Sequence, residues 1–286
     1  MLSEPKSERV FQTTVKNKKI YGIIVATLVV IALAAISILG FGTKKTHFDI
    51  IFFGDSRVGN DRTDTALPVL LENAVNMSVY NAGIGGSTLS YTGEYTTWDI
   101  YSMVSLSKAV AANDFSIQLA NTESAYFDYA EIVDYVPETI KDISKIDFKK
   151  AKYVIIEQGT NDYLSGMKLE GEDKYDESTV GGALRTSIGN IKKASPNAKI
   201  ILISTCFTST PAGYGDELDL GYGTEEDFAN FEKEIAQETG VLFVDLYHES
   251  GINRDNFKDY LFDGLHPNDE GNKVVIDLLT KKFKLD

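Results

Sequence analysis

Apolar, β-branched runs separated by helix-like patterns constrain this chain more than any other feature. Five runs are short enough to be buried strands, and they cover residues 48–53, 78–81, 153–157, 200–204 and 241–245. Patterns with helical spacing lie between them, as at Val180, Leu184 and Ile188. Because strands that alternate with helices form βαβ units, we expect a five-stranded parallel sheet with helices on both faces. Ligands of such sheets bind beyond the carboxyl ends of the strands.

Four short motifs are candidates for a site at this edge of the sheet. They are Gly54-Asp55-Ser56, Asn81-Ala82-Gly83-Ile84-Gly85-Gly86, Gly159-Thr160-Asn161-Asp162 and Asp263-Gly264-Leu265-His266-Pro267. Ser56 follows the first strand and precedes a predicted loop, so its hydroxyl is expected to project from the sheet edge. A single motif of this kind also fits an ordinary turn or helix cap, whereas the four together indicate one site.

A serine, a histidine and an aspartate among these motifs are the residue types of an acyl-transfer site. Ser56 would be the nucleophile, His266 its general base and Asp263 the group that orients the base. Asp263 and His266 lie three positions apart in a predicted loop, so the carboxylate can meet the imidazole N–H directly. Pro267 favours an extended backbone at His266, which helps to fix the ring.

The negative charge that forms on a substrate oxygen needs hydrogen-bond donors. The backbone amides of Ser56 and Gly86 are candidates, and Gly86 lacks a Cβ that would block close approach. The Asn161 side chain is a third candidate. The alternatives are a plain turn at Gly86 and a local Asx turn at Asn161. Asp55 and Asp162 are expected to hold their loops by accepting backbone hydrogen bonds.

The other two histidines are weaker candidates for the base. His47 precedes the first strand and therefore lies at the wrong end of the sheet. His248 follows the last strand, with Asp245 three residues before it, and is the rival base. Because Asp245 belongs to the last turn of that strand rather than to a loop, we expect a direct pair with His248 to be less favourable.

The N-terminal region predicts a membrane anchor. Residues 20–42 are almost wholly apolar, and no charged residue occurs between Lys19 and Lys44. Such a stretch, at about 1.5 Å per helical residue, can cross a hydrocarbon core of about 30 Å. Basic residues before it place residues 1–19 in the cytoplasm and the following domain, residues 46–286, outside. Secretion after cleavage of a signal peptide is the alternative, although no polar region follows the apolar stretch.

Composition excludes several other classes of protein. The formal net charge is −14, and residues 44–286 alone carry 28 − 5 = 23 basic and 42 − 2 = 40 acidic residues, a net −17, so nucleic acid is not an expected partner. The single cysteine, Cys206, rules out an intramolecular disulfide. With three histidines and no CxxC or HExxH pattern, we expect neither a metal nor a cofactor.

The motifs resemble those of the SGNH hydrolase superfamily, whose members are also called GDSL hydrolases. The matching positions, in family order, are Ser56, Gly86, Asn161, Asp263 and His266. The similarity spans residues 48–283, apart from a stretch at about 88–150. It implies a three-layer α/β/α, flavodoxin-like fold and serine esterase, lipase or acyltransferase chemistry without a metal.

The chain departs from this family pattern at two places. Arg57 replaces the usual leucine after the serine, and we expect it to pair with a nearby carboxylate rather than with an anionic substrate group. The tyrosine-rich stretch at 88–150 lies where the family often has one helix, and a segment of this length usually has structure or function of its own.

These features together predict a membrane-anchored, extracytoplasmic serine esterase that acts on an ester-bearing small molecule, lipid or glycan. The expected location and the tyrosine-rich surroundings favour O-acyl groups, such as O-acetyl, on carbohydrate. An O-acyltransferase for cell-surface glycan is an alternative, because the same three residues can pass an acyl group to a sugar hydroxyl. A catalytically inactive surface-binding module is disfavoured, because every catalytic position is intact.

Overall fold

The apolar runs form one parallel sheet. The computed structural model describes residues 46–93, 96–122 and 134–283. The sheet has the order β2-β1-β3-β4-β7, and each neighbouring pair is parallel. Its strands are β1 (Ile50–Gly54), β2 (Val79–Asn81), β3 (Tyr153–Glu157), β4 (Lys199–Ile203) and β7 (Leu242–Val244). The predicted five-stranded parallel sheet is confirmed, with strand ends that differ by a few residues.

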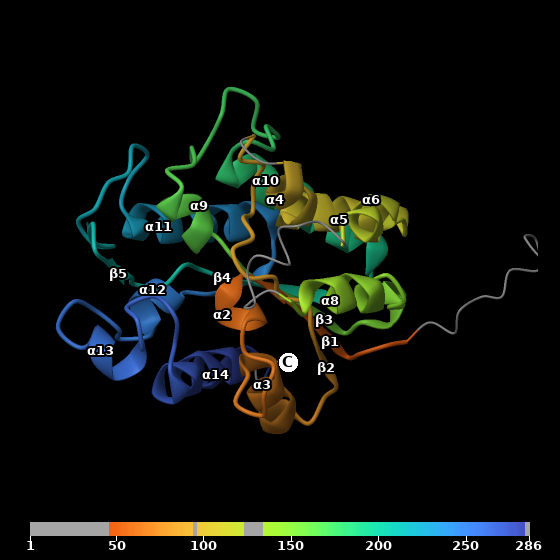
Figure 1. Cartoon of the computed structure of the whole chain (residues 1–286), viewed down its shortest axis with the longest axis horizontal. Helices are drawn as coiled ribbons and strands as arrows, with labels where there is room; N and C mark the ends of the chain where they lie inside the picture. Colours follow the sequence, from red (N-terminus) through yellow and green to blue (C-terminus); the bar gives the residue numbers. More distant parts are fainter. Residues whose placement is uncertain (1–45, 94–95, 123–133, 284–286) are drawn as a thin grey trace, which may run out of the picture. The chain divides into compact units, whose positions relative to one another are not determined.

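Helices cover both faces of the sheet, as Figure 1 shows, and make the expected three layers. One face carries α4 (Thr96–Tyr101), α5 (Met103–Ala112), α8 (Val136–Ile143), α10 (Val180–Ala194) and α11 (Glu225–Thr239). The other carries α3 (Leu67–Val75), α12 (Leu246–Glu249) and α14 (Asp269–Phe283). The shorter elements are α2 (Ser56–Gly59), α6 (Ser116–Ala120), the 3-10 helix η2 (Phe148–Lys150), α9 (Thr160–Leu164), α13 (Phe257–Tyr260) and the antiparallel pair β5 (Ser209–Thr210) and β6 (Gly213–Tyr214).

Alternate side chains of each strand enter opposite cores. Ile51 and Phe53 of β1 belong to the core under α5 and α10, whereas Ile50 and Phe52 belong to the core under α3 and α14. All four are fully buried or nearly so. Helices on both faces therefore explain why these strands are continuous apolar runs instead of alternating ones.

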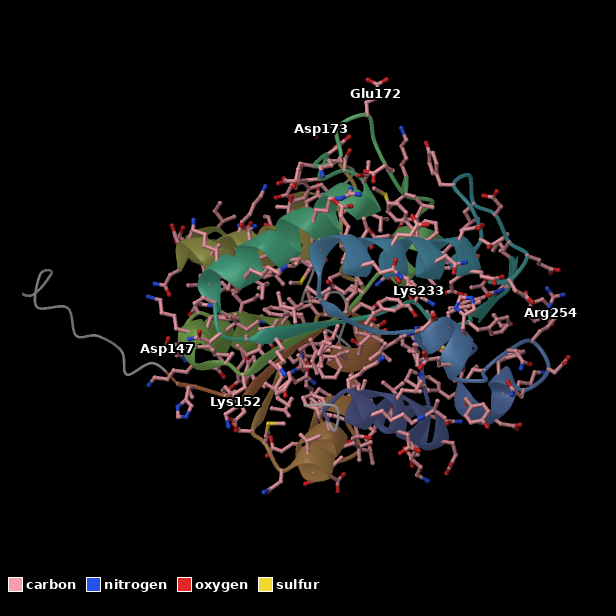
Figure 2. All side chains as sticks on the ribbon, turned by 180° about the vertical axis from the view of Figure 1, so that it is seen from behind. Asp147, Lys152, Glu172, Asp173, Lys233 and Arg254 are labelled. Carbon is pink, nitrogen blue, oxygen red and sulfur yellow. The ribbon has the colours of Figure 1, made fainter. Side chains whose placement is uncertain are left out.

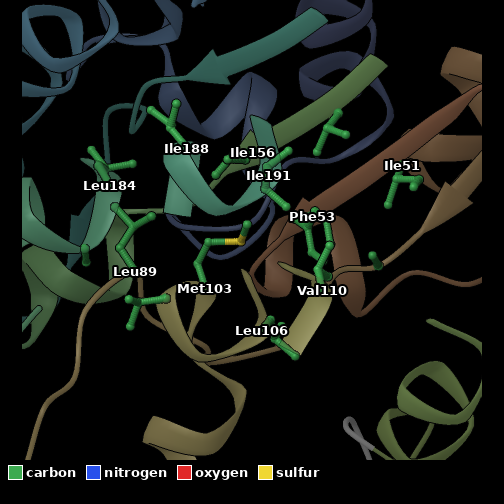
Figure 3. Close-up of a cluster of buried hydrophobic side chains, with 14 of the residues drawn as sticks. Ile51, Phe53, Leu89, Met103, Leu106, Val110, Ile156, Leu184, Ile188 and Ile191 are labelled. Atoms are coloured by element: carbon green, nitrogen blue, oxygen red, sulfur yellow. The ribbon is translucent and has the colours of Figure 1, made fainter. Parts of the chain in front are cut away.

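The 88–150 stretch is part of the core. Helix α5 contributes Met103, Leu106 and Val110, which lie with Phe53 and Ile156 in one buried cluster (Figure 3). Helix α8 belongs to the same stretch and buries Val136, Ile140 and Ile143 in that cluster. The stretch thus supplies part of the layer that covers one face of the sheet, together with α10 and α11.

The strand order places a crevice between β1 and β3. The chain passes from β1 to β2 on one side and then returns to β3 on the other side of β1. At such a reversal the following connections diverge to opposite faces, and ligands bind beyond the strand ends there. The predicted motifs after β1 and β3 flank this point.

Charged side chains project outward from the domain, as Asp147, Glu172 and Arg254 do in Figure 2. The predicted cytoplasmic tail, residues 1–19, and the predicted anchor, residues 20–42, lie outside the described residues. Among the helices of the described ranges, none has the length and apolar character needed to span a bilayer.

Candidate active site

Ser56 lies at the carboxyl end of β1 as the first residue of α2. A loop was predicted after Ser56, and this is wrong, because a short helix begins there. Asp55 caps that helix, and its carboxylate accepts a hydrogen bond from the Arg57 N–H at 3.0 Å. At Gly54, a Cβ would lie 2.6 Å from the Val58 Cβ. The glycine therefore lets the helix pack directly against the strand end.

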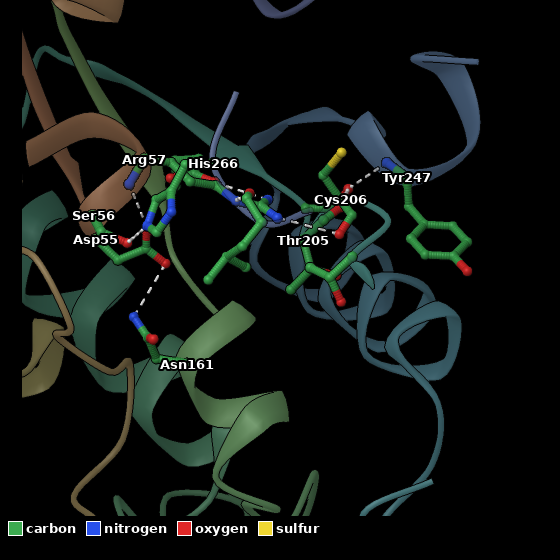
Figure 4. A network of polar contacts seen from close by, with 12 residues as sticks. Asp55, Ser56, Arg57, Asn161, Thr205, Cys206, Tyr247 and His266 are labelled. Atoms are coloured by element: carbon green, nitrogen blue, oxygen red, sulfur yellow. Dashed lines mark hydrogen bonds and ion pairs between the residues drawn. The ribbon is translucent and has the colours of Figure 1, made fainter. Parts of the chain in front are cut away.

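His266 connects this serine to Asp263. Its Nε2 lies 2.9 Å from the Ser56 Oγ, and its Nδ1 lies 2.7 Å from the Asp263 Oδ2 (Figure 4 shows the serine contact). The other Asp263 oxygen accepts the backbone N–H groups of Leu265 at 2.9 Å and His266 at 2.8 Å. Partial burial alone would raise the pKa of Asp263, but these hydrogen bonds lower it, so the group is a carboxylate at neutral pH.

The loop that carries Asp263 and His266 is closed at its base and supported from outside. Leu261 and Pro267 form an antiparallel bridge, and the Phe262 N–H donates to the His266 carbonyl at 3.0 Å. Gly264 has a φ of +87°, and a Cβ there would lie 2.3 Å from the Ser209 carbonyl oxygen. Only glycine fits this position, so the hairpin of β5 and β6 holds the loop at close range.

The three candidate oxyanion donors differ in whether their N–H groups already make hydrogen bonds. Gly86 lies in a turn with a φ of +75°. Within the described ranges, no group accepts a hydrogen bond from the backbone N–H of Gly86 or of Ser56. The Asn161 Nδ2 donates to the Ser87 carbonyl at 2.9 Å and to the Asp55 Oδ2 at 3.4 Å. Two donors are thus available, and the third is held by one firm bond and one long one.

Asp55 and Asp162 are buried supports of the site, as predicted. Asp162 accepts the backbone N–H groups of Leu89 at 2.7 Å and Ser90 at 3.0 Å. Burial raises the pKa of Asp162 to about 6, against the effect of these bonds. Burial also raises the pKa of Asp55, while the charge of Arg57 opposes the shift.

Arg57 is 8 % exposed and joins three segments beneath the site. Its Nε donates to the Leu265 carbonyl at 3.2 Å, its Nη2 donates to the Cys206 carbonyl at 3.4 Å, and its Nη1 lies 3.7 Å from Glu157. The predicted pairing with a carboxylate is confirmed. Burial raises the pKa of both Glu157 and Glu225 to about 8, despite the nearby guanidinium.

A cleft of about 660 Å³ opens at the serine and the histidine. Besides Ser56, Arg57, His266 and Asp263, its lining is mostly amide and carboxylate: Asn60, Asp61, Asn268, Asp269 and Asn272, with Phe262 and Pro267. The Phe262 ring is 71 % exposed and stacks on the His266 ring, with centroids 5.6 Å apart. No sequence motif marks Asn60 or Phe262 as part of the site, although Phe262 directly precedes the Asp263 motif.

The rival pair of Asp245 and His248 forms, contrary to the expectation. Asp245 lies just past β7 as the cap of α12, where its Oδ1 is 2.7 Å from the His248 Nδ1. In that capping position the carboxylate also accepts the His248 N–H at 3.2 Å. The expectation that strand geometry disfavours this pair is therefore wrong. The His248 Nε2 lies 3.3 Å from Glu226, whereas the Ser56 Oγ lies 2.9 Å from the Nε2 of His266.

No three His, Cys, Asp or Glu side chains within the described ranges are grouped so that they could hold a metal ion. At the switch point of the parallel sheet, a serine, a histidine and an aspartate form a chain of contacts. The chain matches the model of the GDSL-like lipase/acylhydrolase family over residues 52–274. It belongs to this family, as the resemblance to SGNH hydrolases indicated, and is a hydrolase that acts on ester bonds.

Solved structures share the fold at low sequence identity. One is a protein from Lactobacillus plantarum, with 19% identity, a TM-score of 0.58, and coverage of 84% of this chain and 98% of that chain. Another is a lipase candidate from Chitinophaga pinensis, with 20% identity, a TM-score of 0.55, and coverage of 83% and 98%. A comparison with curated proteins gave no match.

Proposed function

We propose that Ser56, His266 and Asp263 carry out ester hydrolysis as a nucleophile, its base and the orienting acid. The observation that carries this proposal is the unbroken line of contacts, 2.9 Å from the Ser56 Oγ to the His266 Nε2 and 2.7 Å from the His266 Nδ1 to Asp263. With the proton on Nδ1, the free Nε2 accepts the serine proton as Oγ attacks the ester carbonyl. Asp263 stabilises the imidazolium that results.

The acyl-enzyme then forms and breaks with the same groups. His266 returns its proton to the leaving alcohol, and water, deprotonated by His266, releases the acid from Ser56. The backbone amides of Ser56 and Gly86 are the proposed donors to the oxyanion. Asn161 would join them by exchanging its long 3.4 Å bond to Asp55 for one to the substrate oxygen.

The cleft supports a hydroxyl-rich alcohol as the portion of the substrate outside the ester. The Asn60 Nδ2, whose neighbouring Oδ1 is held by Tyr135, can donate to a hydroxyl group, and the exposed Phe262 ring offers an apolar face for a sugar ring. The carboxylates of Asp61 and Asp269 disfavour an anionic substrate. We therefore propose short O-acyl groups, such as O-acetyl, on uncharged carbohydrate.

The chemical proposal is tested with the full chain and two serine variants. Purified protein is given p-nitrophenyl esters of increasing acyl length and an O-acetylated oligosaccharide. Ser56→Ala is expected to abolish turnover without unfolding the domain, whereas Ser165→Ala, an exposed serine after α9, retains it. Turnover that survives in Ser56→Ala would overturn the mechanism, and a preference for long acyl chains would overturn the substrate class. Transfer to a glycan acceptor instead of water would support the acyltransferase alternative.

The cellular proposal is that residues 20–42 anchor the protein and residues 46–286 lie outside the cytoplasm. It is supported by the length of the apolar stretch and the basic residues before it. Protease treatment of intact cells, followed by detection of tags at both ends, tests this topology. Removal of a C-terminal tag but not of an N-terminal tag is expected, and protection of both would contradict the proposal.

A further inference from the structure

The turn that contains Gly86 is held by a tyrosine from the 88–150 stretch. Tyr135 is half-buried at the start of α8, and its hydroxyl accepts the Gly85 N–H at 2.8 Å. The same hydroxyl donates to the Asn60 Oδ1 at 2.9 Å. Its one proton and one acceptor site are therefore both used, between the end of α2 and the turn.

The Tyr135 hydroxyl and the Asn60 side chain pack closely against two glycines. A Cβ at Gly59 would lie 2.6 Å from the Tyr135 oxygen, and a Cβ at Gly85 would lie 2.2 Å from the Asn60 Oδ1. Two glycines thus make the space for this contact. Any larger residue at either position would displace the tyrosine or the asparagine.

Arg62 fixes the tyrosine ring and the neighbouring backbone at once. Its guanidinium carbon lies 4.0 Å from the centroid of the Tyr135 ring. Its three donor groups bond the carbonyls of Gly59 at 2.7 Å, Asn81 at 3.0 Å and Gly83 at 2.7 Å. Arg62 and Tyr135 together therefore tie α2, the end of β2 and the glycine turn into one unit.

We infer that Tyr135 is a positioning residue for the oxyanion donor at Gly86. The Gly85 N–H that it holds belongs to the residue directly before Gly86, in a turn where Gly86 has a φ of +75°. Rotation of the turn about Gly85 would move the Gly86 N–H away from the serine. The inference rests on the proposed function, because it assigns Tyr135 to the oxyanion site of that reaction.

Tyr135→Phe is the test, because it removes only the hydroxyl. Loss of a whole oxyanion donor typically lowers turnover by about 10²–10³-fold, so a displaced donor is expected to lower kcat by about 10- to 100-fold. KM for a short ester is expected to stay the same, because the ground-state carbonyl depends less on the donor than the oxyanion does. Tyr80→Phe is the matched control, because its hydroxyl donates to the Thr139 carbonyl of α8 at 3.1 Å and not to a group of the turn.

A second measurement separates positioning from general weakening of the fold. Amide hydrogen exchange at Gly85 is expected to accelerate in Tyr135→Phe and not in Tyr80→Phe, while both variants keep wild-type exchange in β1 and β3. An unchanged kcat, a rise in KM alone, or equal losses in the two variants would overturn the inference. If wild type itself fails to hydrolyse esters, the proposed function fails and the inference falls with it. If wild type is active and Tyr135→Phe equals it, only the inference fails.

Discussion

The chain contains two Asp-x-x-His pairs with similar internal geometry and different surroundings. In both, the histidine Nδ1 lies 2.7 Å from the aspartate. In both, the same carboxylate accepts the backbone N–H of the histidine, at 2.8 Å for His266 and 3.2 Å for His248. The second ring nitrogen differs: it meets the Ser56 hydroxyl at 2.9 Å in one pair and the Glu226 carboxylate at 3.3 Å in the other.

The comparison teaches that the pair is a local turn motif and becomes a base only through its third partner. At His248, burial would lower the pKa, but hydrogen bonds to Asp245 and Glu226 raise it and favour the charged ring. Lys233 of α11, labelled in Figure 2, also bonds Asp245, at 2.9 Å. The second pair is therefore a surface ion network, and we expect it to affect stability rather than catalysis.

Replacing each histidine separates the two pairs most strongly. His266→Ala is expected to lower kcat by about 10⁴-fold or more, because the serine loses its proton acceptor. His248→Ala is expected to leave kcat unchanged. Steady-state hydrolysis of a short p-nitrophenyl ester measures both. A large loss in His248→Ala, with the fold intact, would contradict the assignment of the base.

Replacing each aspartate is expected to change kcat in the same direction as replacing its histidine, with a smaller difference between the two pairs. Asp263→Asn is expected to lower kcat by about 10³–10⁴-fold, because the amide no longer stabilises the imidazolium or selects the correct tautomer. Asp245→Asn can still cap α12 and is expected to retain full turnover per folded molecule. Active-site titration and kcat measure both variants. Equal losses of activity would contradict the claim that only the pair at Asp263 takes part in catalysis.

Each histidine also has an aromatic neighbour, which gives a third matched test. Phe262 stacks on His266, and Tyr247 lies edge-on to His248 with ring centroids 5.2 Å apart. An aromatic pair contributes about 0.5–1.5 kcal/mol, so Phe262→Ala is expected to lower kcat/KM by about two- to tenfold. Tyr247→Ala is expected to change neither kcat nor KM. An unchanged kcat/KM in Phe262→Ala would show that the ring contributes neither to the position of His266 nor to substrate binding.

The smallest expected effect is the pH dependence of stability at the second pair. Because the pKa of His248 is raised in the folded state, its contribution is present below the unfolded pKa of about 6.5 and is lost as pH rises through the folded pKa. The His248 side chain is 37% exposed, so solvent screening limits the effect to below about 1 kcal/mol. Denaturant unfolding of wild type and His248→Gln should differ more at about pH 5.5 than at about pH 8.5. An equal difference at both would contradict the charged pair.

Much of the fold could be predicted from local patterns. The runs at 48–53 and 153–157 are apolar because helices cover both faces of the sheet, and so they identify β1 and β3 without any long-range information. The motifs after them mark the sheet edge, because the carboxyl ends of parallel strands meet there. The contact between Ser56 and His266 follows only when these elements are placed together, across 210 residues of chain.

The remaining features depend on contacts that no local pattern signals. Asp245 and His248 have the same spacing as Asp263 and His266. Only the tertiary fold decides which of the two histidines contacts a serine. The contact between Tyr135 and Gly85 joins residues 50 positions apart, and nothing near Tyr135 in the sequence marks it. Likewise, the sequence predicts that Arg57 finds a carboxylate, but not that it also bonds the histidine loop at Leu265.

The central claim is that Ser56 is the nucleophile and His266 its base, and covalent labelling tests it most directly. The full chain is treated with a fluorophosphonate, digested, and the modified peptide is identified by mass spectrometry. We expect one adduct, on Ser56, which is lost in His266→Ala and formed at the wild-type rate in His248→Ala. An adduct on another residue, or labelling of Ser56 that is indifferent to His266, would contradict the account.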